Sequence, residues 1–133
     1  MRYLLDTNIC IYIAKRHPPE VAHQFERLHP GDVGISLITY GELLFGAEKS
    51  QQPERAHDRL QRFVELVPVL ALPDECPCHY ARIRAELERA GTPIGANDLW
   101  IAAHALAARL ILVSNNLREF GRIAGLATEN WAH

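Results

Sequence analysis

Short apolar runs alternate with longer segments of helical spacing, and this alternation is what most restricts the fold of the chain. The apolar runs are too short for helices, so we predict strands there. The predicted strands are residues 3–5, 33–36, 69–72, 110–113 and 127–129. The predicted helices are residues 9–15, 20–28, 37–50, a segment beginning at Pro53, 74–90 and 97–109. Such an order predicts an α/β fold with a mostly parallel sheet of four to five strands, covered on both faces.

Prolines and capping residues define several of the predicted helix ends. His17-Pro18-Pro19 ends the first helix, because a proline disfavours helical backbone in the residue before it. Asn97 is expected to cap the helix that follows it. Thr7 and Asn8 can cap the first helix, which would leave Asp6 available for another role.

Length and composition favour one globular domain spanning residues 1–133. The chain has 133 residues, of which 48% are hydrophobic, and a formal net charge of -2. No apolar stretch approaches the roughly 20 residues that cross a bilayer. The N-terminus lacks the basic and apolar segments of a signal peptide. We therefore expect a cytoplasmic protein without membrane contact.

The charge pattern leaves a nucleic-acid partner open. The net charge provides no overall basic field, but twelve of the fourteen cationic residues are arginines, whose planar groups suit phosphate. Two clusters could contact RNA or could be solvated helix faces. They are Arg55, Arg59 and Arg62, and Arg82, Arg84 and Arg89.

Cysteines suggest a zinc site that the rest of the sequence does not complete. Cys76, Cys78 and His79 form the stretch "CPCH". A four-coordinate structural site needs a second pair of ligands, and no other pair has suitable spacing. We favour the alternative interpretation, a helix start where small thiols pack.

Acidic residues occur where sheets of this class bind ligands. Asp6 follows the first predicted strand, and the polar residues 114–116 follow the fourth, so parallel strands would bring them to one edge. Glu42 and Asp98 share helix faces with apolar and small residues. Singly, Glu42 could be an exposed glutamate, and Asp98 could simply favour a helix N-terminus.

Together these three acids indicate a metal site. Carboxylates that converge at one edge repel one another and need a cation to stay ionised. Oxygen ligands of this kind suit Mg²⁺ or Mn²⁺. The chain offers no candidate Ser-His or Cys-His pair, so the cluster points to metal-assisted phosphodiester hydrolysis.

Four sequence blocks resemble a known family. "LLDTN", "ITYGELLFGAEKS", "GTPIGANDLWIAAHALA" and "LILVSNNLREF" are similar to the PIN domain, and more closely to the VapC toxins of bacterial toxin–antitoxin pairs. The match runs from about residue 2 to Trp131 with the blocks in family order. It implies an α/β/α sandwich and an acidic pocket that binds Mg²⁺ or Mn²⁺.

The resemblance also implies a function and its residues. It implies a metal-dependent endoribonuclease that cuts RNA in the anticodon region of a transfer RNA, and "TNICIYI" with "GTPIGAND" resembles the branch that cleaves initiator transfer RNA. A VapB antitoxin would cover the pocket with its C-terminal segment, and the toxin would form a homodimer. The family's metal-binding and catalytic acids fall on Asp6, Glu42 and Asp98, and Thr7 and Asn8 match the positions that support the first acid by hydrogen bonding.

One position departs from the fullest family pattern. Many PIN domains carry a fourth acid after the fourth strand, where this chain has Ser114, Asn115 and Asn116. We expect these three to position the loop or a water on the metal, and Glu119 is a possible substitute for the missing acid. The hypothesis is one Mg²⁺ that activates a water for attack on an RNA phosphate.

Other functions remain as alternatives. A phosphatase with Asp6 as nucleophile would want a second acid where Asn8 stands. A receiver domain would need an acidic pair after the first strand and a lysine late in the chain. A catalytically degenerate PIN fold that only binds RNA or protein is the main alternative, because the fourth acid is missing.

Overall fold

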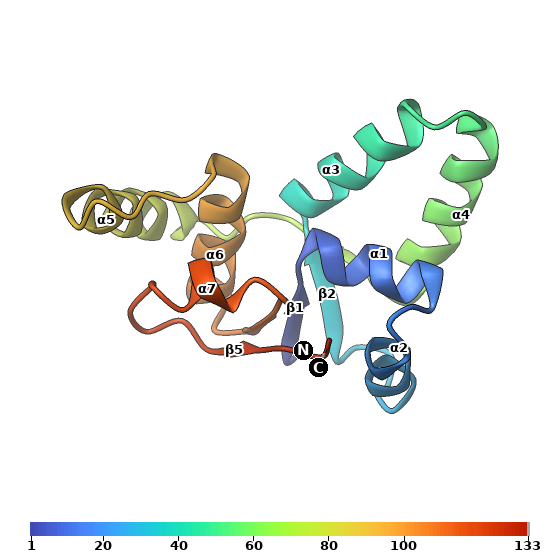
Figure 1. The fold of residues 1–133 in the computed structure, drawn as a ribbon, viewed down its shortest axis with the longest axis horizontal. Coiled ribbons are helices and arrows are strands. Elements are labelled where there is room, and N and C mark those ends of the chain that lie inside the picture. Colours follow the sequence, from blue (N-terminus) through green and yellow to red (C-terminus); the bar gives the residue numbers. More distant parts are fainter. Residues whose placement is uncertain (133) are drawn as a thin grey trace.

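The computed structural model describes residues 1–132, which form a sheet of five parallel strands with helices on both faces (Figure 1). The strands, in the spatial order β3-β2-β1-β4-β5, are β1 (Tyr3–Leu5), β2 (Val33–Ser36), β3 (Val69–Leu70), β4 (Ile111–Val113) and β5 (Thr128–Glu129). The helices are α1 (Thr7–Lys15), α2 (Pro19–Glu26), α3 (Leu37–Glu48), α4 (Pro53–Leu66), α5 (Cys76–Arg89), α6 (Ala96–Ala108) and α7 (Leu117–Phe120). Within residues 1–132, no helix has both the length and the apolar character needed to cross a membrane.

The predicted α/β class and parallel sheet are confirmed, and the differences are at element ends. The strand expected at 110–113 begins one residue later. Arg109 ends α6 in the left-handed region with a φ of 57°, and the Leu110 N–H donates to the Ala105 carbonyl. Leu110 therefore completes the helix end, since this bond satisfies a carbonyl of the last turn.

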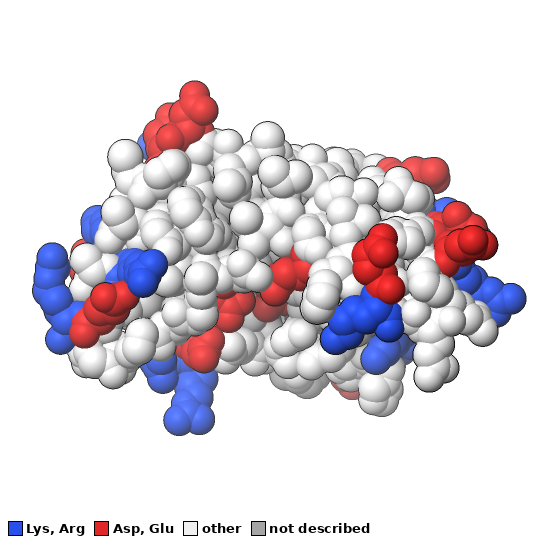
Figure 2. Space-filling model, turned by 90° about the horizontal axis from the view of Figure 1, so that it is seen from above, with Lys and Arg blue, Asp and Glu red and all other residues white. Residues whose placement is uncertain are grey.

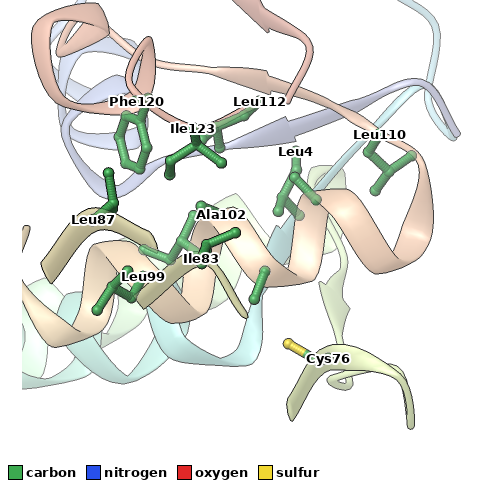
Figure 3. Packing of buried hydrophobic residues seen from close by; sticks show 13 residues of the cluster. Leu4, Cys76, Ile83, Leu87, Leu99, Ala102, Leu110, Leu112, Phe120 and Ile123 are labelled. Carbon is green, nitrogen blue, oxygen red and sulfur yellow. The ribbon is translucent and has the colours of Figure 1, made fainter. Parts of the chain in front are cut away.

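The sheet separates two hydrophobic clusters, because successive strand residues face opposite sides. Leu4 packs with α5 and α6 on one side, in a cluster that includes Ile83 and Phe120 (Figure 3). Tyr3 and Leu5 point to the other side, where α1 and α2 cover the sheet. The result is the three-layered sandwich expected from the sequence, with β1 at its centre.

The parallel register brings the ends of β1 and β4 together, at the end of β1 that leads into α1 in Figure 1. Leu5 pairs with Val113, and the Asp6 N–H donates to the Val113 carbonyl at 3.0 Å. The residues that follow these strands, Asp6 and Ser114, therefore emerge side by side, as the sequence predicted.

The cysteines lie in different environments. Cys76 begins α5 and is buried in the cluster around Leu4, whereas Cys78 is exposed. Cys10 on α1 is buried under the other face of the sheet. The placement of Cys76 fits a small thiol packed at a helix start.

Candidate active site

Asp6 links the end of β1 to the start of α1. Its Oδ1 accepts a hydrogen bond from the Ile9 N–H at 2.9 Å, so Asp6 is the N-cap of α1. The prediction that Thr7 and Asn8 would cap this helix is wrong: Thr7 is already its first residue. Burial raises the pKa of Asp6, and hydrogen bonds from Ser114 and Ile9 partly offset that rise.

Glu42 on α3 is held at both carboxylate oxygens by neutral donors. The Thr7 hydroxyl donates to Oε1 at 2.5 Å and also lies 3.4 Å from the Thr39 hydroxyl. Asn97 Nδ2 donates to Oε2 at 3.3 Å. One carboxylate therefore ties together α1, α3 and α6.

Asn97 does not cap α6, contrary to the prediction from sequence. Gly95 is the N-cap residue, without a side-chain hydrogen bond, and Asn97 is already inside the helix. Its amide turns to Glu42 instead, because the first turn of α6 lies against α3. Thr7 likewise supports Glu42, whereas the resemblance assigned its support to Asp6.

Asp98 lies in the first turn of α6 and is half-buried. Burial, the main cause, and the negative charges of Glu119, Asp6 and Glu42 raise the pKa of Asp98 to about 6, with a further contribution from a hydrogen bond with Glu119. These mutual effects place four carboxylates within electrostatic reach of one another.

The segment after β4 brings Glu119 into the cluster. The buried Ser114 hydroxyl accepts from the Asn116 N–H at 2.9 Å, and Asn116 Nδ2 donates to Glu119 Oε2 at 3.0 Å. The short helix α7 begins directly after Asn116 and is anchored by the buried Phe120. The structure therefore places Glu119, a possible substitute for the fourth acid, beside Asp98.

Asn115 points away from this cluster. Its Nδ2 donates at 2.7 Å to the hydroxyl of Tyr12 on α1. This bond joins the loop after β4 to α1 across more than a hundred residues of sequence, so no local pattern could have predicted it. Asn8 is exposed, and within residues 1–132 its side chain makes no hydrogen bond.

Within residues 1–132, no ion pair includes one of the four acids. The ion pairs found in residues 1–132 involve the basic side chains of Arg16, His57, Arg82 and Arg84, and none reaches the cluster. Figure 2, which views the molecule from above Figure 1, shows acidic side chains along the middle of this face, whereas basic side chains and further acidic ones lie toward its ends. Uncompensated carboxylates are typical of a cation site.

The donor set fits a hard divalent cation bound partly through water. Carboxylate oxygens suit Mg²⁺ or Mn²⁺. In the described part of the chain, residues 1–132, no three acidic, histidine or cysteine side chains lie close enough to enclose an ion directly. Mg²⁺ usually retains several waters and uses only one or two carboxylates directly, so a wider acidic pocket suits it.

Comparison with known proteins gives a family match and relatives that are similar over nearly the whole chain. The family model of the PIN domain matches residues 3–126. The chain is 47% identical to Ribonuclease VapC2 of Haemophilus influenzae, with 98% of each covered. It is 46% identical to the tRNA(fMet)-specific endonuclease VapC of Shigella flexneri, with 99% of each covered.

Solved structures agree with these sequence relatives. A chain of VapBC-1 from nontypeable Haemophilus influenzae superposes with a TM-score of 0.92 at 40% identity, and the match covers 100% of both chains. A chain of the DNA-bound VapBC from Salmonella typhimurium gives a TM-score of 0.91 at 43% identity, with 98% of each chain covered.

Proposed function

Because the chain belongs to the PIN domain family, and within it to the VapC ribonucleases, we propose that it is a metal-dependent endoribonuclease toxin that hydrolyses phosphodiester bonds of transfer RNA. The observation that carries the proposal is that Asp6, Glu42, Asp98 and Glu119 lie within electrostatic reach of one another, and that none of the ion pairs found in residues 1–132 includes one of them. The names of the relatives favour an enzyme over a degenerate binding scaffold.

The proposed roles of the residues follow from their contacts. Asp6, Glu42 and Asp98 would hold the ion, directly or through waters, and Glu119 would supply the fourth negative charge. An ion held there would lower the pKa of a coordinated water and would offset the charge that develops on the phosphate. Thr7 and Asn97 fix the rotamer of Glu42 through its two oxygens.

Ser114 and Asn116 have supporting roles in this proposal. The Ser114 hydroxyl holds Asp6 and accepts from the backbone of Asn116, while the Asn116 amide holds Glu119. The pair therefore connects the first and fourth acids without adding charge. Because the pKa of Asp98 is raised to about 6, this carboxyl keeps a proton in mildly acidic solution, and a bound cation would favour its ionised form.

The substrate we propose is initiator transfer RNA, cut in its anticodon region. Relatives from Shigella flexneri and Salmonella typhimurium are named tRNA(fMet)-specific endonucleases, at 46% and 43% identity. Mg²⁺ is the proposed ion and Mn²⁺ its substitute, since both prefer oxygen ligands.

The proposed partners are a VapB antitoxin and a second copy of the chain, in the cytoplasm. The similar structures include VapBC complexes from Haemophilus influenzae and Salmonella typhimurium. For the homodimer, Leu37 and Phe45 offer apolar surface on one face of α3, with 49% and 64% exposure.

The test is a cleavage assay on total bacterial RNA with the antitoxin-free protein, with and without Mg²⁺ or Mn²⁺. Discrete metal-dependent cuts are expected, mapping to one transfer RNA, and Asp98→Asn should abolish them. A folded, antitoxin-free protein that leaves the RNA intact with either metal would overturn the proposal in favour of a binding scaffold.

A further inference from the structure

A row of arginines follows one edge of α4. Arg55, Arg59 and Arg62 are exposed and lie at positions i, i+4 and i+7, so they share one helix face. Within residues 1–132, none of the three makes an ion pair or a side-chain hydrogen bond. Their charges are therefore available to a partner.

The acids of α4 lie on a different face. Glu54, Asp58 and Glu65 follow the spacing i, i+4 and i+11, which places them on the neighbouring side of the helix. A solvated helix face usually mixes both signs through pairs at i and i+4, as Arg84 and Glu88 do on α5 at 2.8 Å. On α4, Asp58 and Arg62 have the same i, i+4 spacing, yet within residues 1–132 they form no ion pair.

A groove of about 510 Å³ runs from the acidic site to Arg59, the member of the row that belongs to its lining. It lies between α1, α3 and α4, and its lining includes Thr7 and Glu42 at the site. Arg59 and Lys15 also line it. The groove therefore has a carboxylate and two basic side chains in its lining.

We infer that Arg55, Arg59 and Arg62 bind phosphates of the RNA strand next to the cleaved bond. The row is about 10 Å long at 1.5 Å per helical residue, longer than the rise between successive phosphates in one strand. Arginine forks bind phosphate oxygens bidentately. The inference rests on the proposed function. It places the RNA-binding surface on α4 rather than on the arginines of α5.

An acidic protein segment is the other partner that such a row could bind. The groove also borders Glu42, whose charge would repel acidic side chains. A phosphodiester strand must bring its reacting phosphate to the acids in the proposed reaction, where a bound cation would offset their charge. The RNA strand is therefore the better match for a groove whose charged lining residues are Glu42, Arg59 and Lys15.

The experiment measures transfer RNA binding in the non-cleaving Asp98→Asn background, using fluorescence anisotropy over a range of salt concentrations. The triple variant with Arg55, Arg59 and Arg62 changed to Gln is compared with a matched triple in which Arg82, Arg84 and Arg89 are changed to Gln. Both remove three positive charges from an exposed helix. Circular dichroism and thermal unfolding confirm that each variant folds.

The α4 triple should weaken binding by about tenfold or more, and it should reduce the slope of log affinity against log salt by about two. The α5 triple should leave the slope unchanged. Equal losses in both triples, or an unchanged slope in the α4 triple, would overturn the inference. The inference would also be overturned if the α4 triple kept its affinity for RNA but lost affinity for a VapB antitoxin. The arginine row would then be a contact surface for the protein partner.

Failure of this inference can be told apart from failure of the proposed function. In the metal-dependent cleavage assay, an α4 triple in the otherwise unchanged chain should cut more slowly than wild type, with the loss relieved at high RNA concentration. If wild type cuts and the α4 triple cuts equally well, only the arginine row is wrong. If wild type does not cut, the proposed function itself fails.

Discussion

Asn97 and Glu42, which are 55 residues apart in the chain, are joined by a hydrogen bond of 3.3 Å from the amide to Oε2. The bond crosses from the first turn of α6 to the middle of α3. Together with the Thr7 hydroxyl on Oε1, it leaves Glu42 little rotational freedom. A carboxylate held in this way is preorganised for a cation, because its supporting donors are neutral and do not compete for its charge.

Replacing Asn97 should therefore loosen the metal site without disturbing the fold. For Asn97→Ala we expect metal affinity to fall by about tenfold, the usual cost of losing an outer partner of a metal ligand. Titration calorimetry with Mn²⁺ measures it, and cleavage should recover at high metal concentration. Gln51→Ala, at an exposed position between α3 and α4, is the control. An unchanged Mn²⁺ affinity in Asn97→Ala would contradict the role.

Glu119 gives a second prediction. In Glu119→Gln the negative charge beside Asp98 is removed, so the pKa of Asp98 should move down toward its ordinary value. Carbon-detected NMR titration of the aspartate carboxyl groups in the metal-free protein would follow this change. Cleavage should fall by about tenfold, because the pocket loses one of its four charges. If the titration of Asp98 stays the same, Glu119 is not the fourth acid of the cluster.

The sequence was sufficient for the layers of the fold and for the location of the site. Alternating apolar and helical segments predict a parallel sheet, and an acid just beyond a parallel strand must lie at its carboxyl edge. Asp6 was therefore placed from the sequence alone. Glu42 and Asp98 needed the family resemblance as well, since each has an ordinary explanation on its own helix.

Partners that depend on side-chain direction could not be predicted. Asn97 has the residue type of a helix cap, yet Gly95 takes that position and the Asn97 amide turns to another helix. The bond from Asn115 to Tyr12 depends on how α1 lies against the loop after β4, which no local pattern encodes. Asp6 was expected to be free of capping and is itself the cap, because a single carboxylate can serve both tasks.

The raised pKa of Asp98 predicts how the metal-free protein responds to pH. The value of about 6 in the folded state exceeds the unfolded value of about 3.9, so the folded state holds the proton more tightly. Stability of the metal-free protein should therefore decrease as pH rises from about 4 to 6, and the penalty remains at neutral pH. Part of the shift is screened, since the carboxyl is partly exposed.

Asp98→Asn should remove that penalty. At pH 7 and without metal, we expect the variant to be more stable than wild type by about 1–2 kcal/mol, which corresponds to a Tm several degrees higher. Differential scanning calorimetry in the presence of a chelator measures it. Saturating Mg²⁺ should reverse the order, because wild type gains more from the ion. A variant no more stable than wild type at pH 7 would show that neither burial nor the neighbouring acids penalise the ionised Asp98 carboxylate.

His104 on α6 should lower the stability of the protein as pH falls, whereas Asp98 lowers it as pH rises. It is 1% exposed, and within residues 1–132 its Nδ1 has no hydrogen-bond partner. Burial lowers the pKa of His104, so the unfolded chain takes up the proton first, near pH 6.5. A folded state with neutral His104 therefore has its full stability above about pH 6.5. This stability is lost as pH falls toward the lowered pKa of His104 in the folded state.

Substitution of His104 by Leu should flatten this dependence. We expect urea unfolding between pH 7.5 and 5.5 to show a smaller loss of stability in His104→Leu than in wild type, since no buried group then has to be protonated. His23→Gln, at an exposed position on α2, should behave as wild type. Comparing each variant with wild type at the same pH cancels the opposing effect of Asp98. If all three proteins lost the same amount of stability, the imidazole of His104 would be accessible to water in the folded state, directly or through local opening.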